Sequence, residues 1–183
     1  MKIIYLFIIF IVVALAQILV PIQMIIGSED TITTGTAYKF KTRPVDPTDP
    51  FRGKYITLQY EVNHFNTTDS TYVVGEEIYI YLKKDTLGFA EVSQISKTPL
   101  ETREDYVKAR VTYYYQGKVS FQLPFNTFYM EESKAYDAEL AYIKANRDSL
   151  RTNVYALVYI KNDKVVLEDV YIDDIPIQEY VEK

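Results

Sequence analysis

An almost unbroken apolar run over residues 3–26 is the feature that most constrains how this chain can fold. Three residues interrupt it: Gln17, Pro21 and Gln23. At about 1.5 Å of rise per residue, a helix of this length reaches about 36 Å and can cross a hydrocarbon layer of about 30 Å. Lys2 precedes the run, so the positive-inside rule predicts a cytoplasmic N-terminus. We expect a single-pass signal-anchor over residues 1–27 and an extracytoplasmic domain, periplasmic or external, over residues 28–183.

A cleavable signal peptide is the alternative interpretation of the same run. Lys2 would be its charged start, residues 3–13 its apolar core and residues 14–16 (Ala-Leu-Ala) its cleavage site, after Ala16. A mature chain beginning at Gln17 would expose the remaining apolar residues to water. We therefore favour an uncleaved anchor, and both interpretations export the rest of the chain.

The composition excludes several classes of site. The 183 residues include no Cys, which excludes disulfides, thiolate zinc sites and a Cys nucleophile. Without Lys2 the chain has 19 Lys and Arg against 25 Asp and Glu, which leaves a formal charge of −6. Nucleic-acid binding lacks the dense basic patch that it requires. His64 is the single His and lacks a nucleophile motif, so we predict a surface or strand-edge position for it.

Most of the chain after the apolar run alternates apolar and polar residues with the period of a β-strand. Tyr38 and Phe40, for example, fall on one face of the first such segment. The predicted strands cover residues 37–42, 55–62, 77–82, 89–95, 106–115, 119–123, 154–160 and 165–171. Tight turns at 116–118 and 162–163 indicate hairpins. We predict a mainly β, antiparallel domain, either a β-sandwich or a partly closed barrel.

One soluble helix is predicted over residues 131–146. Tyr136, Leu140 and Ile143 recur there at helical spacing, and acidic residues occupy the first turn, where the helix dipole favours them. Residues 28–36, between the apolar run and the first strand, form a short polar segment that is expected to be a linker or a first turn. The fold class is therefore mainly β with one soluble helix and one N-terminal transmembrane helix.

The most unusual polar segment covers residues 44–53, which contain three Pro and cannot form a central strand. Asp46 and Asp49 each precede a Pro. They either cap turns or form a carboxylate pair for cation binding or acid–base chemistry, and we favour the turns. Arg52 either braces this loop against the two aspartates or offers its guanidinium to a partner, and we favour the brace.

Residues 53–60, Gly-Lys-Tyr-Ile-Thr-Leu-Gln-Tyr, resemble the motif that names the bacterial GDYXXLXY family. Gly53, Tyr55, Leu58 and Tyr60 match it, whereas Lys54 replaces the Asp. The lead-in at 46–53, the Phe-Tyr-x-x-Glu segment at 128–132 and the closing segment at 170–180 are also similar to that family. The resemblance implies a membrane-anchored envelope protein without assigned catalysis, often encoded beside a multi-pass membrane protein. Because of Lys54, any mechanism that needs the motif Asp is in doubt here.

We hypothesise a non-enzymatic accessory or binding protein of the cell envelope, with a membrane protein or an envelope ligand as its partner. The alternatives are a hydrolase or glycan-acting enzyme that uses carboxylates of residues 46–60 and 128–132, or a purely structural subunit. We expect no cofactor and no resident metal. The predicted binding residues are Asp46, Asp49, Arg52, Tyr55, Tyr60, Tyr129 and Glu132.

Overall fold

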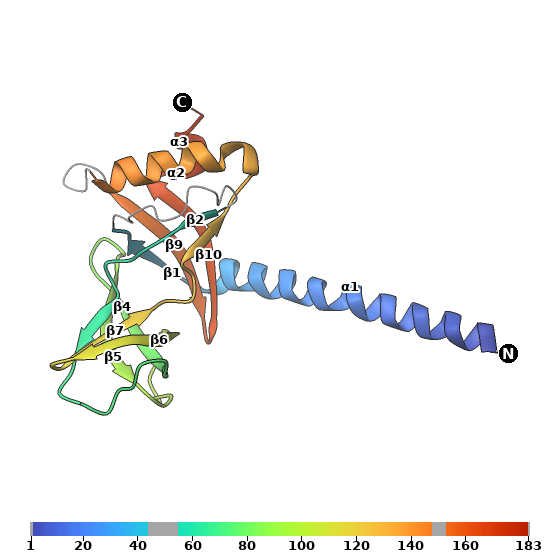
Figure 1. Cartoon of the computed structure of the whole chain (residues 1–183), viewed down its shortest axis with the longest axis horizontal. Helices are drawn as coiled ribbons and strands as arrows, with labels where there is room; N and C mark the ends of the chain where they lie inside the picture. Colours follow the sequence, from blue (N-terminus) through green and yellow to red (C-terminus); the bar gives the residue numbers. More distant parts are fainter. Residues whose placement is uncertain (1, 44–54, 148–152, 183) are drawn as a thin grey trace.

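The computed structural model describes residues 2–43, 55–147 and 153–182 (Figure 1). Asp46, Asp49 and Arg52 lie outside these residues. Three helices are present in the described ranges: α1 (Lys2–Thr34), α2 (Glu132–Arg147) and α3 (Ile177–Tyr180). The first strands are β1 (Thr36–Lys41), β2 (Tyr55–Thr57), β3 (His64–Asn66), β4 (Glu77–Lys84), β5 (Ala90–Ser96) and β6 (Tyr106–Tyr115). The remaining strands are β7 (Lys118–Gln122), β8 (Thr127–Tyr129), β9 (Val154–Lys161), β10 (Lys164–Ile172) and β11 (Ile175–Pro176).

The strands form antiparallel sheets, which confirms the predicted fold class. One sheet has the order β1-β9-β10-β11, and a second has the order β3-β7-β6-β4-β5. The edge strands β3 and β5 of the second sheet approach each other, so this sheet is nearly closed into a barrel. A short pair, β2-β8, completes the described strands. Figure 1 shows α2 and α3 lying together over the end of the first sheet.

Helix α1 projects away from the domain and exposes its apolar side chains along its length (Figure 1). It is long and apolar enough to span a membrane. The prediction of a linker or first turn at residues 28–36 is wrong, because the helix continues to Thr34. The polar residues there do not break the helix, since their hydroxyls donate to carbonyl oxygens of the preceding turn. Thr31, for instance, donates to the Gly27 carbonyl at 2.8 Å and is fully buried against the sheet.

Gly35 allows a close approach of the chain at the junction of α1 and β1. A Cβ at this position would lie 2.4 Å from the carbonyl oxygen of Thr31 and 2.9 Å from that of Ile160. Such distances are too short for any side chain, so the chain can pass from helix into β1 at this point because the residue is glycine.

Helix α2 uses a different face from the one that its larger apolar residues indicate. Tyr136 and Leu140 are 66 % and 49 % exposed. The buried residues are Ala135, Ala138, Tyr142, Ala145 and Asn146. Small alanines let the helix approach the sheet closely, and a buried hydrogen bond from the Thr42 hydroxyl to the Asn146 side-chain carbonyl, at 2.9 Å, joins it to the end of β1.

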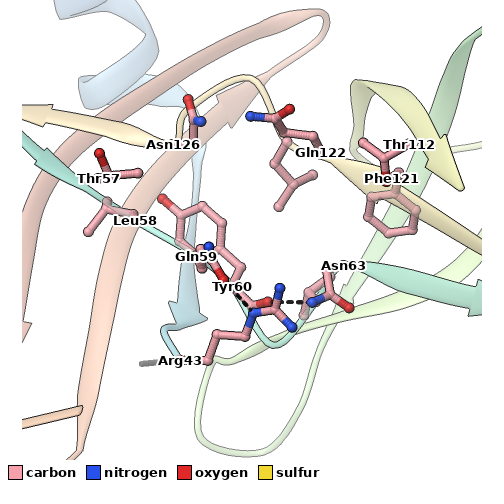
Figure 2. A pocket seen from close by; sticks show the side chains of 12 residues that line it. Arg43, Thr57, Leu58, Gln59, Tyr60, Asn63, Thr112, Phe121, Gln122 and Asn126 are labelled. Carbon is pink, nitrogen blue, oxygen red and sulfur yellow. Dashed lines mark hydrogen bonds between the residues drawn. The ribbon is translucent and has the colours of Figure 1, made fainter. Parts of the chain in front are cut away.

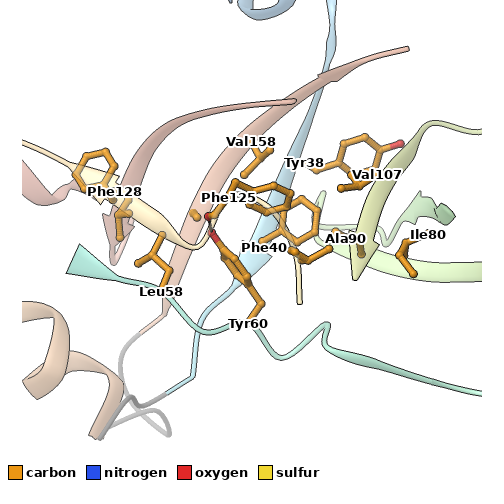
Figure 3. Packing of buried hydrophobic residues seen from close by; sticks show 14 of the residues in the cluster. Tyr38, Phe40, Leu58, Tyr60, Ile80, Ala90, Val107, Phe125, Phe128 and Val158 are labelled. Carbon is orange, nitrogen blue, oxygen red and sulfur yellow. Dashed lines mark hydrogen bonds between the residues drawn. The ribbon is translucent and has the colours of Figure 1, made fainter. Parts of the chain in front are cut away.

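The core is one continuous cluster that includes residues of both large sheets (Figure 3). Phe40 of β1 lies in its centre and is fully buried. Its ring contacts those of Phe125, at 5.0 Å between centroids, and Tyr60, at 5.7 Å. Both pairs are edge-to-face, a favourable geometry for aromatic rings. The prediction that Tyr38 and Phe40 share one face is confirmed, because both are buried.

We predict that Phe40→Ala lowers the free energy of unfolding by about 3–5 kcal/mol, because it leaves a cavity where the two sheets meet. Denaturant unfolding of the full-length protein in detergent, followed by tyrosine fluorescence, measures the change. Tyr136→Ala on the exposed face of α2 is the control and should change stability by about 0.5 kcal/mol or less. Equal effects of the two substitutions would contradict this description of the core.

Candidate functional site

Two chain segments, 55–66 and 118–129, pair with each other twice and separate in between. Tyr55 of β2 pairs with Tyr129 of β8. His64 of β3, nine residues after Tyr55, pairs with Ser120 of β7, nine residues before Tyr129. The register is therefore the same at both ends. At the ends of these ladders the Leu58 N–H donates to the Asn126 carbonyl at 2.8 Å and the Phe121 N–H donates to the Asn63 carbonyl at 2.9 Å. Between these two bonds, residues 59–62 and 122–125 separate. We call this gap the ladder opening.

The first segment leaves its partner because it pairs with the end of β1 instead. Thr42 and Tyr60 form an antiparallel bridge. The Arg43 backbone N–H donates to the Gln59 carbonyl at 2.9 Å, and the Glu61 N–H donates to the Lys41 carbonyl at 3.0 Å. This detour connects the end of the first sheet to the segment that supplies β2 and β3.

Tyr60 joins the two sides of the ladder opening at its floor. Its hydroxyl donates to the Phe125 carbonyl at 2.7 Å, and its ring lies 5.3 Å from that of Phe125. The pKa of the Tyr60 phenol is raised, mainly by burial. The hydroxyl therefore keeps its proton and remains a donor. Leu58 is also buried, and its N–H donates to the Asn126 carbonyl at 2.8 Å. Two of the motif residues, Leu58 and Tyr60, thus build the floor of the opening.

The ladder opening contains a cavity of about 340 Å³. Figure 2 shows polar side chains around its rim. Four are carboxamides: Gln59, Asn63, Gln122 and Asn126. The other polar lining residues are Arg43, Thr57 and Thr112. The apolar lining residues are Leu58, Tyr60, Val62, Phe121 and Leu123. Among the described residues, no carboxylate lines this cavity, so Arg43 is its one charged group.

Two polar groups of the rim are held in place by hydrogen bonds. The Arg43 Nε–H donates to Gln59 Oε1 at 3.1 Å, and the Asn63 amide donates to the Tyr60 carbonyl at 3.1 Å (Figure 2). Each carboxamide carries both a donor and an acceptor. The rim can therefore bind a ligand that presents donors and acceptors side by side, as peptide groups do.

Three of the four described residues that were predicted from the sequence lie on the paired segments 55–66 and 118–129. Tyr60 is in the floor of the opening, and Tyr55 and Tyr129 pair beyond it, with ring centroids 5.6 Å apart. Tyr129 is 72 % exposed. Glu132 begins α2, three residues after Tyr129, and does not line the cavity. Asp46, Asp49 and Arg52 lie outside the described residues, so their predicted role stays a prediction.

Sequence reasoning missed the polar rim. Gln59 was recognisable as lying on the face opposite Leu58 and Tyr60, because the strand alternates. Gln122 and Asn126 carry no such signal, since they come from a segment more than fifty residues away in the chain. Their convergence depends on the shared register of the two ladders.

His64 is exposed on the edge strand β3, as predicted. Partial desolvation lowers its pKa, and the positive charges of Lys118 and Arg43 lower it further. Within the ranges that the structure describes, no three His, Asp or Glu side chains are grouped to hold a metal ion.

Comparison with known proteins gives one match. The profile of a family described as GDYXXLXY protein matches residues 17–169, which is most of the chain. No match was found among curated proteins or among solved structures.

We predict that Tyr60→Phe lowers the free energy of unfolding by about 1–3 kcal/mol, because the buried Phe125 carbonyl loses its donor. Tyr113→Phe, at a 58 % exposed position on β6, is the matched control and should have little effect. Thermal or denaturant unfolding in detergent measures both. An unchanged stability of Tyr60→Phe would show that this hydrogen bond does not hold the opening together.

Stability should also decrease above pH 10. Burial raises the pKa of the Tyr142 phenol to about 12 and raises that of Tyr60 as well, whereas an unfolded tyrosine titrates near its usual value of 10. Between these values the unfolded chain holds fewer protons than the folded one, so alkali favours unfolding. Each such group contributes at most about 1.4 kcal/mol per pH unit. Unfolding curves at pH 9, 10 and 11 should show a shallower decrease for Tyr60→Phe than for the unaltered protein.

Proposed function

The chain belongs to the GDYXXLXY family, and from this premise we propose that it is a membrane-anchored accessory protein of the bacterial envelope that binds a polypeptide segment of a membrane partner. Helix α1 would be the anchor, and the ladder opening would be the binding site. The observation that carries the proposal is the carboxamide-lined cavity at the motif residues.

The anchor is supported by the length and exposure of α1. Apolar side chains from Ile3 to Ile26 are exposed all round this helix, an arrangement that a lipid environment accounts for and water does not. Lys2 precedes these residues, and Glu29 and Asp30 follow them. This charge distribution favours a cytoplasmic N-terminus and a domain on the other side of the membrane.

The chemistry of the ladder opening favours a polypeptide ligand. A carboxamide can exchange two hydrogen bonds with a backbone peptide group. Gln122 and Asn126 lie on one side of the gap, and the amide group of Gln59, whose oxygen accepts from Arg43, lies on the other. The two separated segments continue into regular ladders at either end, so an extended chain has room between them. Apolar groups such as Leu123 and Phe121 offer contacts for its side chains.

The tether favours a partner that is itself in the membrane. Attachment to one bilayer raises the effective concentration of two binding surfaces without any additional contact. A site that relies on neutral hydrogen bonds and a single arginine gives modest affinity in solution, and it is suited to such a setting.

The enzymatic alternative requires the Glu132 carboxylate. Glu132 lies in the first turn of α2, where the helix dipole stabilises its negative charge.

We expect a photo-crosslinking residue at Thr112, in the wall of the opening, to form an adduct with a membrane protein in the cells that produce this chain. The same residue at Leu87, which is 70 % exposed on the β4–β5 turn, is the control and should form none. Gln59→Ala combined with Asn126→Ala should reduce the adduct at least about five-fold, since each net hydrogen bond contributes about 1 kcal/mol. Gln94→Ala on β5 should not.

An adduct that is sensitive to glycosidase and resistant to protease would contradict a polypeptide ligand. Equal adduct yields at Thr112 and Leu87 would remove the ladder opening as the site.

The absence of Cys from the sequence makes the topology directly testable. A thiol introduced as Leu87→Cys should react with a membrane-impermeant maleimide in intact cells. A cysteine inserted after Met1 should react only after the membrane is permeabilised. The opposite pattern would place the domain in the cytoplasm and contradict the proposed topology.

A further inference from the structure

A crevice lies between the last turns of α1 and the β9–β10 hairpin. Its volume is about 420 Å³. The residues that matter here are Val20, Met24 and Gly27 on the helix, and Lys164, Val165 and Val166 on β10. It shares no lining residue with the ladder opening, so it is a second and separate site.

The position of this crevice along α1 determines its depth in a membrane. A hydrocarbon layer of about 30 Å accommodates about 20 helical residues. The exposed apolar side chains of α1 run from Ile3 to Ile26, about 36 Å of helix that fits this layer when tilted, so Val20 and Met24 lie inside it and Gly27 lies at its edge. The crevice therefore crosses the boundary between acyl chains and headgroups. This step rests on the membrane span of the proposed function.

Apolar and cationic groups follow one another along the crevice in the order found in a phospholipid. Val20 and Met24, on the acyl side, are 58 % and 69 % exposed. Lys164 lies on the headgroup side, where its Nζ is 2.9 Å from the position that a Cβ on Gly27 would occupy. The glycine thus leaves room for an ammonium group at the level where lipid phosphates lie.

The two lysines at the end of the hairpin have different partners. The Lys161 ammonium pairs with the Asp30 carboxylate at 2.6 Å, and this hydrogen bond lowers the pKa of Asp30. For Lys164, no carboxylate of the described residues lies within 4.0 Å. The Asp30 carboxylate also attracts Lys164 at longer range, and Asp163 directly precedes Lys164 in the chain, so the positive charge here is limited to a single ammonium that no described carboxylate contacts.

The hydroxyl groups at this level already have acceptors. Ser28 donates to the Met24 carbonyl at 3.1 Å, and Thr31 donates to the Gly27 carbonyl at 2.8 Å. Lys164 is therefore the cationic group of the crevice that can contact a phosphate, and the Gln23 carboxamide, which also lines the crevice, is a second donor.

We propose that this crevice binds a phospholipid of the leaflet that faces the domain. One acyl chain contacts Val20, Met24 and Val166, and the phosphodiester contacts the Lys164 ammonium. Because the hairpin belongs to the first sheet, the bound lipid holds the whole domain at a defined height and orientation on the membrane.

The test uses the full-length protein in nanodiscs of phosphatidylcholine and phosphatidylglycerol, with a fluorophore on one introduced thiol. A label at Val166→Cys should be quenched by lipids that carry a spin label on the headgroup, and a label at Leu87→Cys should not. Asp163→Cys, at the exposed hairpin end, gives a second reporter if the Val166 variant is unstable. A label at Val12→Cys should be quenched by lipids labelled in the middle of the acyl chain and reports the span itself.

Quenching at Val12 without quenching at Val166 or Asp163 would overturn the lipid site and leave the membrane span intact. Absence of quenching at Val12 would overturn the span and the lipid site together.

The headgroup contact is tested by native mass spectrometry of lipids retained by the protein. Lys164→Gln should reduce retention of phosphatidylglycerol relative to phosphatidylcholine by about five-fold, the effect of one ammonium at an anionic surface. Lys118→Gln, the same change of charge on β7 of the other sheet, is the matched control and should leave retention unchanged. Equal retention by the two variants would overturn the role of Lys164.

Discussion

The contact between Phe40, Tyr60 and Phe125 is the interaction on which the rest of the structure depends. Phe40 comes from the first sheet, and the other two rings come from the two sides of the ladder opening. The hydrogen bond from Tyr60 to the Phe125 carbonyl fixes the distance between those sides. One aromatic cluster therefore joins the two large sheets, and its Tyr60 also forms part of the cavity floor. Stability and the candidate binding site share the same residues.

This arrangement gives the family motif a structural meaning. Leu58 and Tyr60 point into the core, whereas Gln59 between them faces the cavity. The strand also pairs with β1 at this point, so that it belongs to both halves of the domain. The spacing of Leu58 and Tyr60 in the motif is therefore explained by the fold.

The junction of α1 with the domain is the second constraint. Burial of Thr31, the close approach at Gly35 and the ion pair between Asp30 and Lys161 attach the end of the helix to the β9–β10 hairpin. A helix that ended in a flexible linker would leave the domain free to rotate. Here the helix continues almost directly into β1, so the position of the ladder opening relative to α1 follows from the fold.

The sequence by itself determined the apolar helix, the mainly antiparallel β fold and the family, because hydrophobic periodicity and the motif depend on neighbouring residues. It also placed Tyr38 and Phe40 correctly on one face of a strand, and the structure buries that face. It failed at residues 28–36, where hydroxyl groups bond to their own helix, and at α2, where small alanines pack in place of Tyr136 and Leu140. The tertiary structure alone decided the cavity and the crevice, since Gln59 meets Gln122 and α1 meets Lys164 only through long-range pairing. Local patterns specify which face of a strand is buried, but they do not specify which distant segment lies beside it.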